Sequence, residues 1–351
     1  MSWVTRLARP EIVALKAYEH AAWEPSLERL HANELPWRSA ADESRAGLNR
    51  YPEPQPRALV ERLASLYEVP PESVLVGRGS DEAIDLLVRG FCRAGHDSVV
   101  ICPPTFGMYS VAARIQGADV LEVPLRAAEG FALDEQAVLD RCSRDVKLVF
   151  LCSPNNPTGN LLSAESILRL TRALEERALV VVDEAYIEFS DSASLARHIP
   201  DLPHLAVLRT LSKAHALAGA RCGTLIADPE IVALLRKVIP PYALAQLSVE
   251  AVLKALEPAQ LAISAARLRT IQSERDRLLE SLPKSANVVR VWPSAANFVL
   301  AQFEDAPLAL ARSRGARLLI RDVRGYAGLG GCLRITVGSP EQNIRLLDAM
   351  R

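Results

Sequence analysis

The sequence predicts an α/β protein with a mostly parallel central sheet, helices on both faces of that sheet, and a smaller α+β part towards the C-terminus. Short apolar runs alternate with segments of helical period over much of the chain, which is the pattern of βαβ crossovers. The runs are short and flanked by helical segments on both sides, as expected of strands that are buried on both faces. The length of 351 residues allows one large domain or two ordinary ones.

The expected elements follow in chain order. The apolar runs that predict strands of the central sheet are 73–76, 98–102, 119–123, 148–151, 179–182, 205–208 and 223–227. Helical periodicity predicts helices between them at 81–91, 164–177 and 230–238. One or two helices over 247–282 then lead to further strands at 288–292, 297–301, 318–321 and 333–336. We therefore expect an N-terminal arm (1–29) that packs on another part of the molecule, a large cofactor-binding domain (30–245) and a small C-terminal domain (246–351).

Composition narrows the class of protein. Lys and Arg total 41 and Asp and Glu total 42, for a net charge of −1, which argues against a nucleic-acid-binding protein. No apolar run approaches the ~18 residues of a membrane helix, and the N-terminus has no apolar signal region. The six cysteines are widely spaced and several lie in apolar runs, as reduced, buried thiols do. We expect a cytoplasmic protein that binds neither membrane nor metal.

An anion site is predicted where the first strand of the sheet ends. The stretch Gly77-Arg78-Gly79-Ser80-Asp81 joins that strand to an amphipathic helix. Glycines let the backbone approach a ligand closely, and the free N–H groups of a first helical turn can bind a phosphate. An ordinary N-cap by Ser80 or Asp81 is the alternative interpretation. Glu82 stands where a dinucleotide-binding loop has its third glycine, so that fingerprint fails.

Two further strands end in polar groups. The loop 153–159, with sequence SPNNPTG, follows the strand 148–151 at the edge where open parallel sheets bind ligands, although a simple exposed loop is the alternative. Asp183 ends the strand 179–182, and a buried carboxylate there needs a cationic or hydrogen-bonding partner, which a helix N-cap could also supply. Tyr186 follows three residues later and can turn its hydroxyl towards the same crevice.

Lys213 lies among small and apolar residues after the strand 205–208. A desolvated lysine near other cations has a lowered pKa and becomes a nucleophile, whereas a snorkelling surface lysine is the alternative. Thr210, Ser212 and Arg221 around it supply donors suited to a phosphate. Together these features match the needs of pyridoxal 5′-phosphate: an amine, an acidic partner for the ring nitrogen, donors for the ring oxygen and a phosphate cup.

With these motifs the sequence resembles the fold-type I pyridoxal-phosphate aminotransferases, and within them the histidinol-phosphate aminotransferases. The resemblance runs over nearly the whole chain. Its segments are 49–56 (NRYPEPQP), 77–87, 102–109 (CPPTFGMY), 153–160, 182–189 (VDEAYIEF), the stretch around Lys213, and 333–338 (LRITVG). The resemblance implies a central sheet and small domain of the fold-type I kind.

The resemblance also implies catalytic roles. Lys213 would hold the cofactor covalently and then shuttle a proton. Asp183 would keep the ring nitrogen protonated, so that the ring remains an electron sink. Tyr186 and Asn156 would donate hydrogen bonds to the ring oxygen.

Other residues would bind the cofactor or the substrate. Phe106 would stack on the ring, and the phosphate would be held by Ser80, Asp81, Ser212, Arg221 and, from the neighbouring subunit of a homodimer, Tyr51. Arg334 would bind the anionic group of the substrate. Tyr18 and Arg321 are candidates for the phosphate of histidinol phosphate.

The activity implied is transamination between L-glutamate and imidazole-acetol phosphate in L-histidine biosynthesis, giving L-histidinol phosphate and 2-oxoglutarate. An aromatic amino-acid aminotransferase and a phosphothreonine decarboxylase of the same fold are the alternatives. A pyridoxal-binding transcription regulator would need an added basic module, and none is evident.

Three positions depart from the pattern of the family. Phe106 stands where tyrosine is frequent, which removes a hydroxyl but keeps a stacking face. His215 stands where phenylalanine is usual, and we expect it to pack beside the site. Leu35 replaces a more common Asn or Tyr, which bears on substrate contacts and not on the cofactor.

Overall fold

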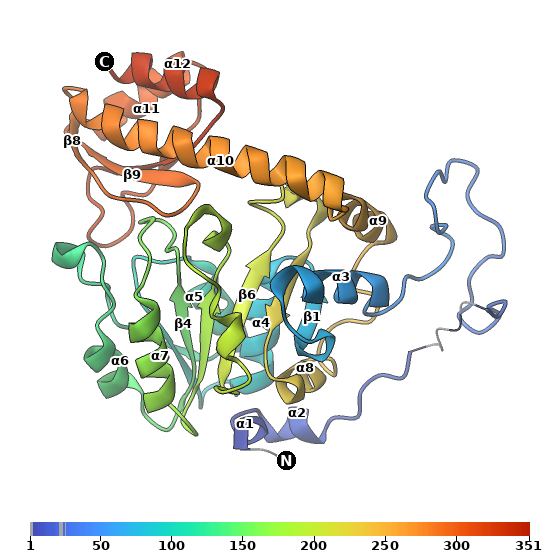
Figure 1. Ribbon diagram of the computed structural model, residues 1–351. Coiled ribbons are helices and arrows are strands. Elements are labelled where there is room, and N and C mark those ends of the chain that lie inside the picture. The colour runs from blue at the N-terminus through green and yellow to red at the C-terminus, as the bar shows by residue number, and fades with distance from the viewer. Residues whose placement is uncertain (1–2, 21–23, 25) are drawn as a thin grey trace.

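The computed structural model describes residues 3–20, 24 and 26–351. A large sheet occupies the middle of the molecule, and a smaller sheet lies above it with the C-terminus (Figure 1). The long helix α10 (Pro258–Ser281) crosses the top of the molecule between the two parts. Within the described part of the chain, no helix is both long and apolar enough to cross a membrane.

The large sheet has seven strands in the order β1-β7-β6-β5-β4-β2-β3. Their bounds are Val74–Gly77, Gly223–Ile226, Leu205–Thr210, Leu179–Asp183, Val146–Cys152, Ser98–Ile101 and Asp119–Glu122, in that order. Strand β7 runs antiparallel to both of its neighbours, while the pairs β2–β3, β2–β4, β4–β5 and β5–β6 are parallel. The predicted mostly parallel sheet is confirmed, and every strand expected for it is present.

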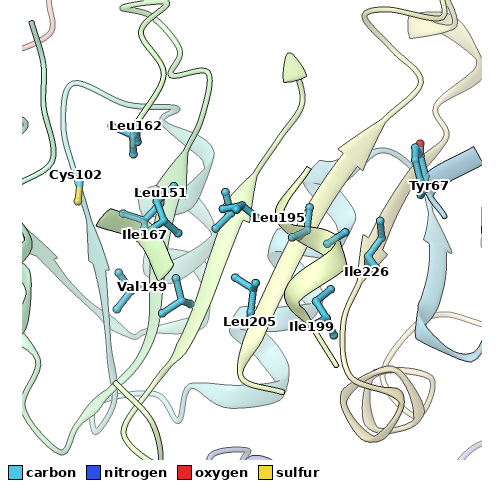
Figure 2. Close-up of a cluster of buried hydrophobic side chains, with 14 of the residues drawn as sticks. Tyr67, Cys102, Val149, Leu151, Leu162, Ile167, Leu195, Ile199, Leu205 and Ile226 are labelled. Atoms are coloured by element: carbon cyan, nitrogen blue, oxygen red, sulfur yellow. The ribbon is translucent and has the colours of Figure 1, made fainter. Parts of the chain in front are cut away.

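Helices cover both faces of the large sheet because alternate residues of its strands face opposite ways. Val149 and Leu151 of β4 belong to the core beneath α3 and α7, where Figure 2 shows them among apolar neighbours. Leu148 and Phe150 of the same strand belong to the opposite core, beneath α4, α5 and α8. The helices that flank the sheet are α3 (Arg57–Tyr67), α4 (Ser80–Phe91), α5 (Met108–Gln116), α6 (Glu135–Arg141), α7 (Ala164–Ala173) and α8 (Pro229–Leu235).

Helix α7 ends earlier than the sequence periodicity predicts. The expected helix ran to residue 177, but the helix ends at Ala173. Glu176 adopts a left-handed backbone with φ of 57°. A non-glycine residue in that conformation cannot continue a right-handed helix, so the chain turns there into β5.

The C-terminal part pairs an antiparallel sheet with the helices α9 to α12. Helix α9 (Gln246–Ala255) precedes α10, and Pro258 begins α10, where its missing N–H is not needed. The four strands lie in the order β10-β11-β9-β8, with bounds Arg321–Asp322, Cys332–Thr336, Phe298–Phe303 and Val288–Val291. Of the strand expected at 318–321, only residue 321 is in β10. Helices α11 (Ala306–Gly315) and α12 (Pro340–Met350) complete this part. The domain limits 30–245 and 246–351 stay a prediction.

The N-terminal segment begins with two short helices, α1 (Trp3–Arg6) and α2 (Pro10–Ala14). Val4, Leu7 and Ala8 are buried in the core that also contains α8, so this segment packs on the large sheet's helices. Residues 26–56 run along one side of the molecule to α3 (Figure 1). Large apolar side chains there face solvent, among them Leu30 and Trp37, which are 93% and 77% exposed.

Candidate active site

A cavity of ≈ 530 Å³ opens at the carboxyl ends of the central strands. The turns after β1, β2, β4, β5 and β6 line its floor and walls, and residues of β10, β11 and the segment between them complete it from the C-terminal part. The strand ends meet here because parallel strands present their carboxyl ends at one edge of a sheet. The sequence-predicted residues that line the cavity are Ser80, Asp81, Phe106, Asn156, Asp183, Tyr186, Ser212, Lys213, Arg221, Arg321 and Arg334.

The turn before α4 forms a cradle for an anion. Gly79 has φ of +86°, a conformation that favours glycine, and it directs the chain into the first turn of α4. A Cβ on Gly223 of β7 would lie 2.4 Å from the Ser80 nitrogen, so only glycine lets that strand approach the turn this closely. Arg221 reaches the same turn and donates to Asp81 Oδ2 at 3.2 Å. Backbone N–H groups at a helix start beside an arginine suit a phosphate group.

Asp183 is a buried part of the cavity wall. Its side chain is 3% exposed, and burial raises the pKa of this carboxyl to about 6, even though two hydrogen bonds favour the charged form. The Tyr109 hydroxyl donates to Asp183 Oδ2 at 2.8 Å, and the Ala185 N–H donates to Oδ1 at 3.1 Å. Among the described residues no cation lies within ion-pair distance of Asp183. The carboxylate is therefore held in place with its charge available to a cationic ligand.

Lys213 follows β6 and points its amine into the same cavity, 5.7 Å from the centre of the Tyr186 ring. Partial burial lowers the pKa of its ammonium, and the charges of Arg334 and Arg221 lower it further. Thr210 donates to the Ser212 hydroxyl at 3.0 Å, which orders the turn that carries the lysine. An amine with a lowered pKa is a better nucleophile and proton carrier near neutral pH.

Arg321 and Arg334 form the side of the cavity that faces the C-terminal part. They are directly paired in the antiparallel ladder of β10 and β11. The Arg334 guanidinium donates to Asn156 Oδ1 and lies 5.1 Å from the centre of the Phe298 ring. Burial and the neighbouring Arg321 lower the pKa of Arg334, and its Nε has no partner among the described residues. Two arginines this close call for an anionic ligand.

Tyr51 and Tyr18 lie outside the cavity of this chain. The Tyr51 ring is half exposed and stacks on Tyr242 at 4.7 Å, and Tyr18 is 68% exposed beside His20. Their assigned roles stay predictions. His215 does not line the cavity either; burial lowers the pKa of its imidazole.

Sequence reasoning missed Tyr109, Val323 and Tyr326. Tyr109 is fully buried, and its ring stacks on Phe150 at 4.9 Å with its edge towards Phe106. Its position one turn after Phe106, at the start of α5, was a usable signal, because that spacing places both rings on one side of the helix start. Val323 and Tyr326 come from the segment between β10 and β11, where the sequence shows no motif.

The residues present fit pyridoxal 5′-phosphate. The glycine cradle at Gly79 and Gly223 would take the phosphate, Asp183 the ring nitrogen, Phe106 the ring face, and Lys213 the aldehyde. No group of three metal-ligating side chains occurs within the described residues.

Comparisons with known proteins agree with this geometry. The family model "Aminotransferase class I and II" matches residues 27–350. The chain is 48% identical over 351 residues to the histidinol-phosphate aminotransferase of Stenotrophomonas maltophilia (strain R551-3), covering 99% of this chain and 96% of that protein.

Two solved structures have a similar fold. The histidinol-phosphate aminotransferase of Sinorhizobium meliloti, in complex with pyridoxal-5′-phosphate, has a TM-score of 0.78 and 26% identity, covering 86% of this chain and 82% of that one. The L-threonine-O-3-phosphate decarboxylase of Porphyromonas gingivalis has a TM-score of 0.71 and 25% identity, covering 86% and 90%. The predicted fold class is confirmed.

Proposed function

Because the chain belongs to the class I and II aminotransferase family, we propose that it is a pyridoxal-phosphate-dependent transaminase of L-histidine biosynthesis. It moves an amino group between L-glutamate and imidazole-acetol phosphate, giving L-histidinol phosphate and 2-oxoglutarate. The observation that carries the proposal is the meeting of Lys213 and Asp183 with Arg321 and Arg334 in one cavity. The 48% identity over the whole chain to a histidinol-phosphate aminotransferase supports the choice of substrate.

Pyridoxal phosphate, when bound, supplies the electron-withdrawing ring that carries the amino group between the two half-reactions. The protein's own groups bind, orient and move protons. The Lys213 amine, whose pKa is lowered, would hold the cofactor through its aldehyde and would carry the proton to and from the substrate's α-carbon. The cradle at Gly79 and Ser80 with Arg221 fixes the phosphate end, so the lysine meets a ring of fixed orientation.

Asp183 controls the electronics from the opposite end of the ring. A cationic ring nitrogen beside this carboxylate favours the ionised form of Asp183, and the ionised form in turn keeps the nitrogen protonated. Asn156 and Tyr186 line the same cavity and would donate to the ring oxygen. The Arg334 guanidinium donates a hydrogen bond to the Asn156 side chain. An anionic substrate that binds Arg334 therefore also affects the hydrogen bonding of the Asn156 amide.

The arginine pair explains how one site takes two amino donors. Glutamate carries a second carboxylate and histidinol phosphate carries a phosphate, so both present an anion away from the reacting carbon. Arg334 and Arg321 lie beside each other on β11 and β10 and can bind either anion.

The first test is the visible absorption spectrum of the purified protein. We expect a yellow band that disappears on addition of L-histidinol phosphate and returns with 2-oxoglutarate. A yellow protein that does not respond to histidinol phosphate would contradict the substrate assignment, while the cofactor assignment would stand. Carbon dioxide release from O-phospho-L-threonine would instead indicate the decarboxylase. Faster turnover of phenylpyruvate than of the phosphorylated substrate would indicate the aromatic amino-acid aminotransferase.

The working enzyme is proposed to be a cytoplasmic homodimer in which Tyr51 reaches the partner's phosphate site. The exposed apolar side chains of the segment before α3, such as Leu30 and Trp37, and the half-exposed Tyr51 support this. Mixing inactive Lys213→Ala subunits with weakly active Tyr51→Ala subunits tests it. Hybrid dimers contain one site with an intact lysine and an intact tyrosine, so activity returns on mixing. No recovery after verified subunit exchange would contradict the shared site.

A further inference from the structure

A second cavity, of ≈ 650 Å³, lies at the opposite edge of the large sheet from the active site. Its walls are the segment 142–147 that leads into β4, residues 176–177 before β5, and helix α1. These are the amino ends of strands whose carboxyl ends line the active-site cavity. The second cavity is therefore separated from the active site by the length of the strands.

Positive charge dominates this second cavity. Arg6, Arg144, Lys147 and Arg177 line it, and Glu176 is the carboxylate among its lining residues. The chain as a whole has a net charge of −1, so this local excess does not follow from the composition. Cations gathered around a concave surface raise the local concentration of anions more than the same charges spread over a flat one.

The neighbouring carboxylates neutralise little of this charge. Glu176 lies 3.7 Å from Arg6, and both side chains are 64% exposed, so water screens that pair. Lys147 lies 3.9 Å from Asp97, but Arg93 already holds Asp97 with bonds of 2.8 and 3.0 Å.

Arg144 and Arg177 are the cations best placed to bind a ligand. Neither forms an ion pair with any residue in the described ranges. Arg177 is fixed by a hydrogen bond from Nη2 to the Cys142 carbonyl, at 2.5 Å. A guanidinium held in this way loses little side-chain freedom when it binds a planar or tetrahedral oxyanion.

An apolar wall completes the cavity. Trp3 and Leu7 of the N-terminal segment line it beside the cations. The Trp3 ring is held by the buried His204 ring, with the two ring centres 5.0 Å apart. A fixed indole face is a stacking surface for a flat ring. The volume is within the range of pockets that bind small organic molecules, and it exceeds what a bare phosphate ion needs.

We infer that this second cavity binds a phosphate monoester that carries an aromatic or heteroaromatic ring. Arg144, Arg177 and Lys147 bind the phosphate, and Trp3 stacks on the ring. The site is independent of the transamination chemistry, and the inference does not rest on the proposed function.

Titration calorimetry on the cofactor-loaded enzyme tests the inference, with adenosine 5′-monophosphate as the probe. We expect the probe to bind more tightly than either inorganic phosphate or adenosine, and more weakly as salt is added. The double variant Arg144→Gln with Arg177→Gln should weaken binding about tenfold or more, because it removes two charged contacts. The matched control Arg312→Gln with Arg345→Gln makes the same change of charge at exposed positions of α11 and α12 and should leave binding unchanged.

Trp3 gives a second readout. Its fluorescence should change on binding, and Trp3→Leu should weaken adenosine 5′-monophosphate while leaving inorganic phosphate unaffected. If the double variant does not fold, Arg144→Gln alone serves, since no ion pair is lost within the described structure. Equal binding in wild type and either Arg144 variant overturns the inference, as does adenosine 5′-monophosphate binding no more tightly than inorganic phosphate.

Discussion

Asp183 and Glu184 are consecutive carboxylates at the end of β5, and they face opposite sides of the sheet. Both are nearly inaccessible to solvent, at 3% and 1% exposure, and burial raises the pKa of both. Glu184 accepts hydrogen bonds from the Ser194 hydroxyl and the Leu195 N–H, and Arg209 lies 3.6 Å away. Asp183 has two hydrogen-bond donors and no ion-pairing cation among the residues described.

The difference separates a structural carboxylate from a functional one. Glu184 has its partners within the chain, since Arg209, which also pairs with Glu188, lies 3.6 Å from it and two hydrogen-bond donors hold its oxygens. The carboxylate of Asp183 faces a cavity, where a cationic group of a ligand can pair with it. A buried charge without a cation costs stability, and that cost is accepted at sites whose ligand supplies the missing charge.

The largest expected effect comes from Asp183→Asn. The amide keeps the size of the side chain but cannot hold a protonated ring nitrogen, so kcat should fall about a thousandfold. Steady-state rates with L-histidinol phosphate and 2-oxoglutarate measure this. The unfolding free energy of the cofactor-free variant should be equal to or higher than that of the wild type, since a poorly balanced charge is removed. A kcat within about tenfold of wild type would contradict the assigned role of Asp183.

Glu184→Gln should lower the stability of the protein and leave its activity nearly unchanged. The amide offers one acceptor where Ser194, Leu195 and Arg209 approach, so the unfolding free energy should drop by about 3 kcal/mol. Urea unfolding measures the loss, and activity per folded molecule should stay near that of the wild type. If Glu184→Gln were as inactive as Asp183→Asn while still folded, the contrast between the two carboxylates would be wrong.

The pH dependence of stability sharpens the same contrast. Burial raises the pKa of Asp183 from its ordinary value of 3.8 to about 6, so between these values the folded cofactor-free protein binds more protons than the unfolded chain. The contribution of Asp183 to stability is therefore greatest at low pH and falls by about 2 kcal/mol between pH 4 and pH 7. Subtracting the unfolding free energy of Asp183→Asn isolates this contribution. A difference that does not change with pH would show that Asp183 has an ordinary pKa.

Much of the fold was predictable from the sequence because its signals are local. Strand β2 occupies 98–101 where 98–102 was expected, and β5 occupies 179–183 where 179–182 was expected. Apolar runs of this kind are unambiguous when both faces of a strand are buried. β10 was harder to predict, since a two-residue edge strand is defined by its pairing with β11 and not by its own sequence.

The site was predictable where a residue follows a strand, and less so elsewhere. Asp183 ends β5 and Lys213 lies in the turn that follows β6, so the parallel sheet alone brings them to one edge. Tyr109 gave a weaker signal because its role depends on a contact with Asp183, 74 residues further along the chain. The role proposed for Tyr51 depends on a second subunit, which one chain's pattern does not position, and the role proposed for Tyr18 stays a prediction.

Tyr109→Phe should give the smallest effect, and it tests what holds Asp183 in its charged form. The variant removes the hydroxyl that donates to Asp183 and keeps the ring that stacks on Phe150. Without this donor the pKa of Asp183 rises further, so the acidic limb of the kcat/KM profile should move to higher pH. The cofactor should bind about tenfold more weakly, as expected for one hydrogen bond to a charged group.

The matched control is Tyr67→Phe. The Tyr67 hydroxyl is also buried but has no hydrogen-bond partner among the described residues, so its removal should leave the pH profile and the cofactor affinity unchanged. Titration of the visible absorbance and of cofactor binding measures both variants side by side. If both changed the profile equally, the effect would come from packing around the sheet. If neither variant changed the profile, the Tyr109 hydroxyl would not stabilise the charged form of Asp183. The Ala185 N–H would then be the donor that stabilises it.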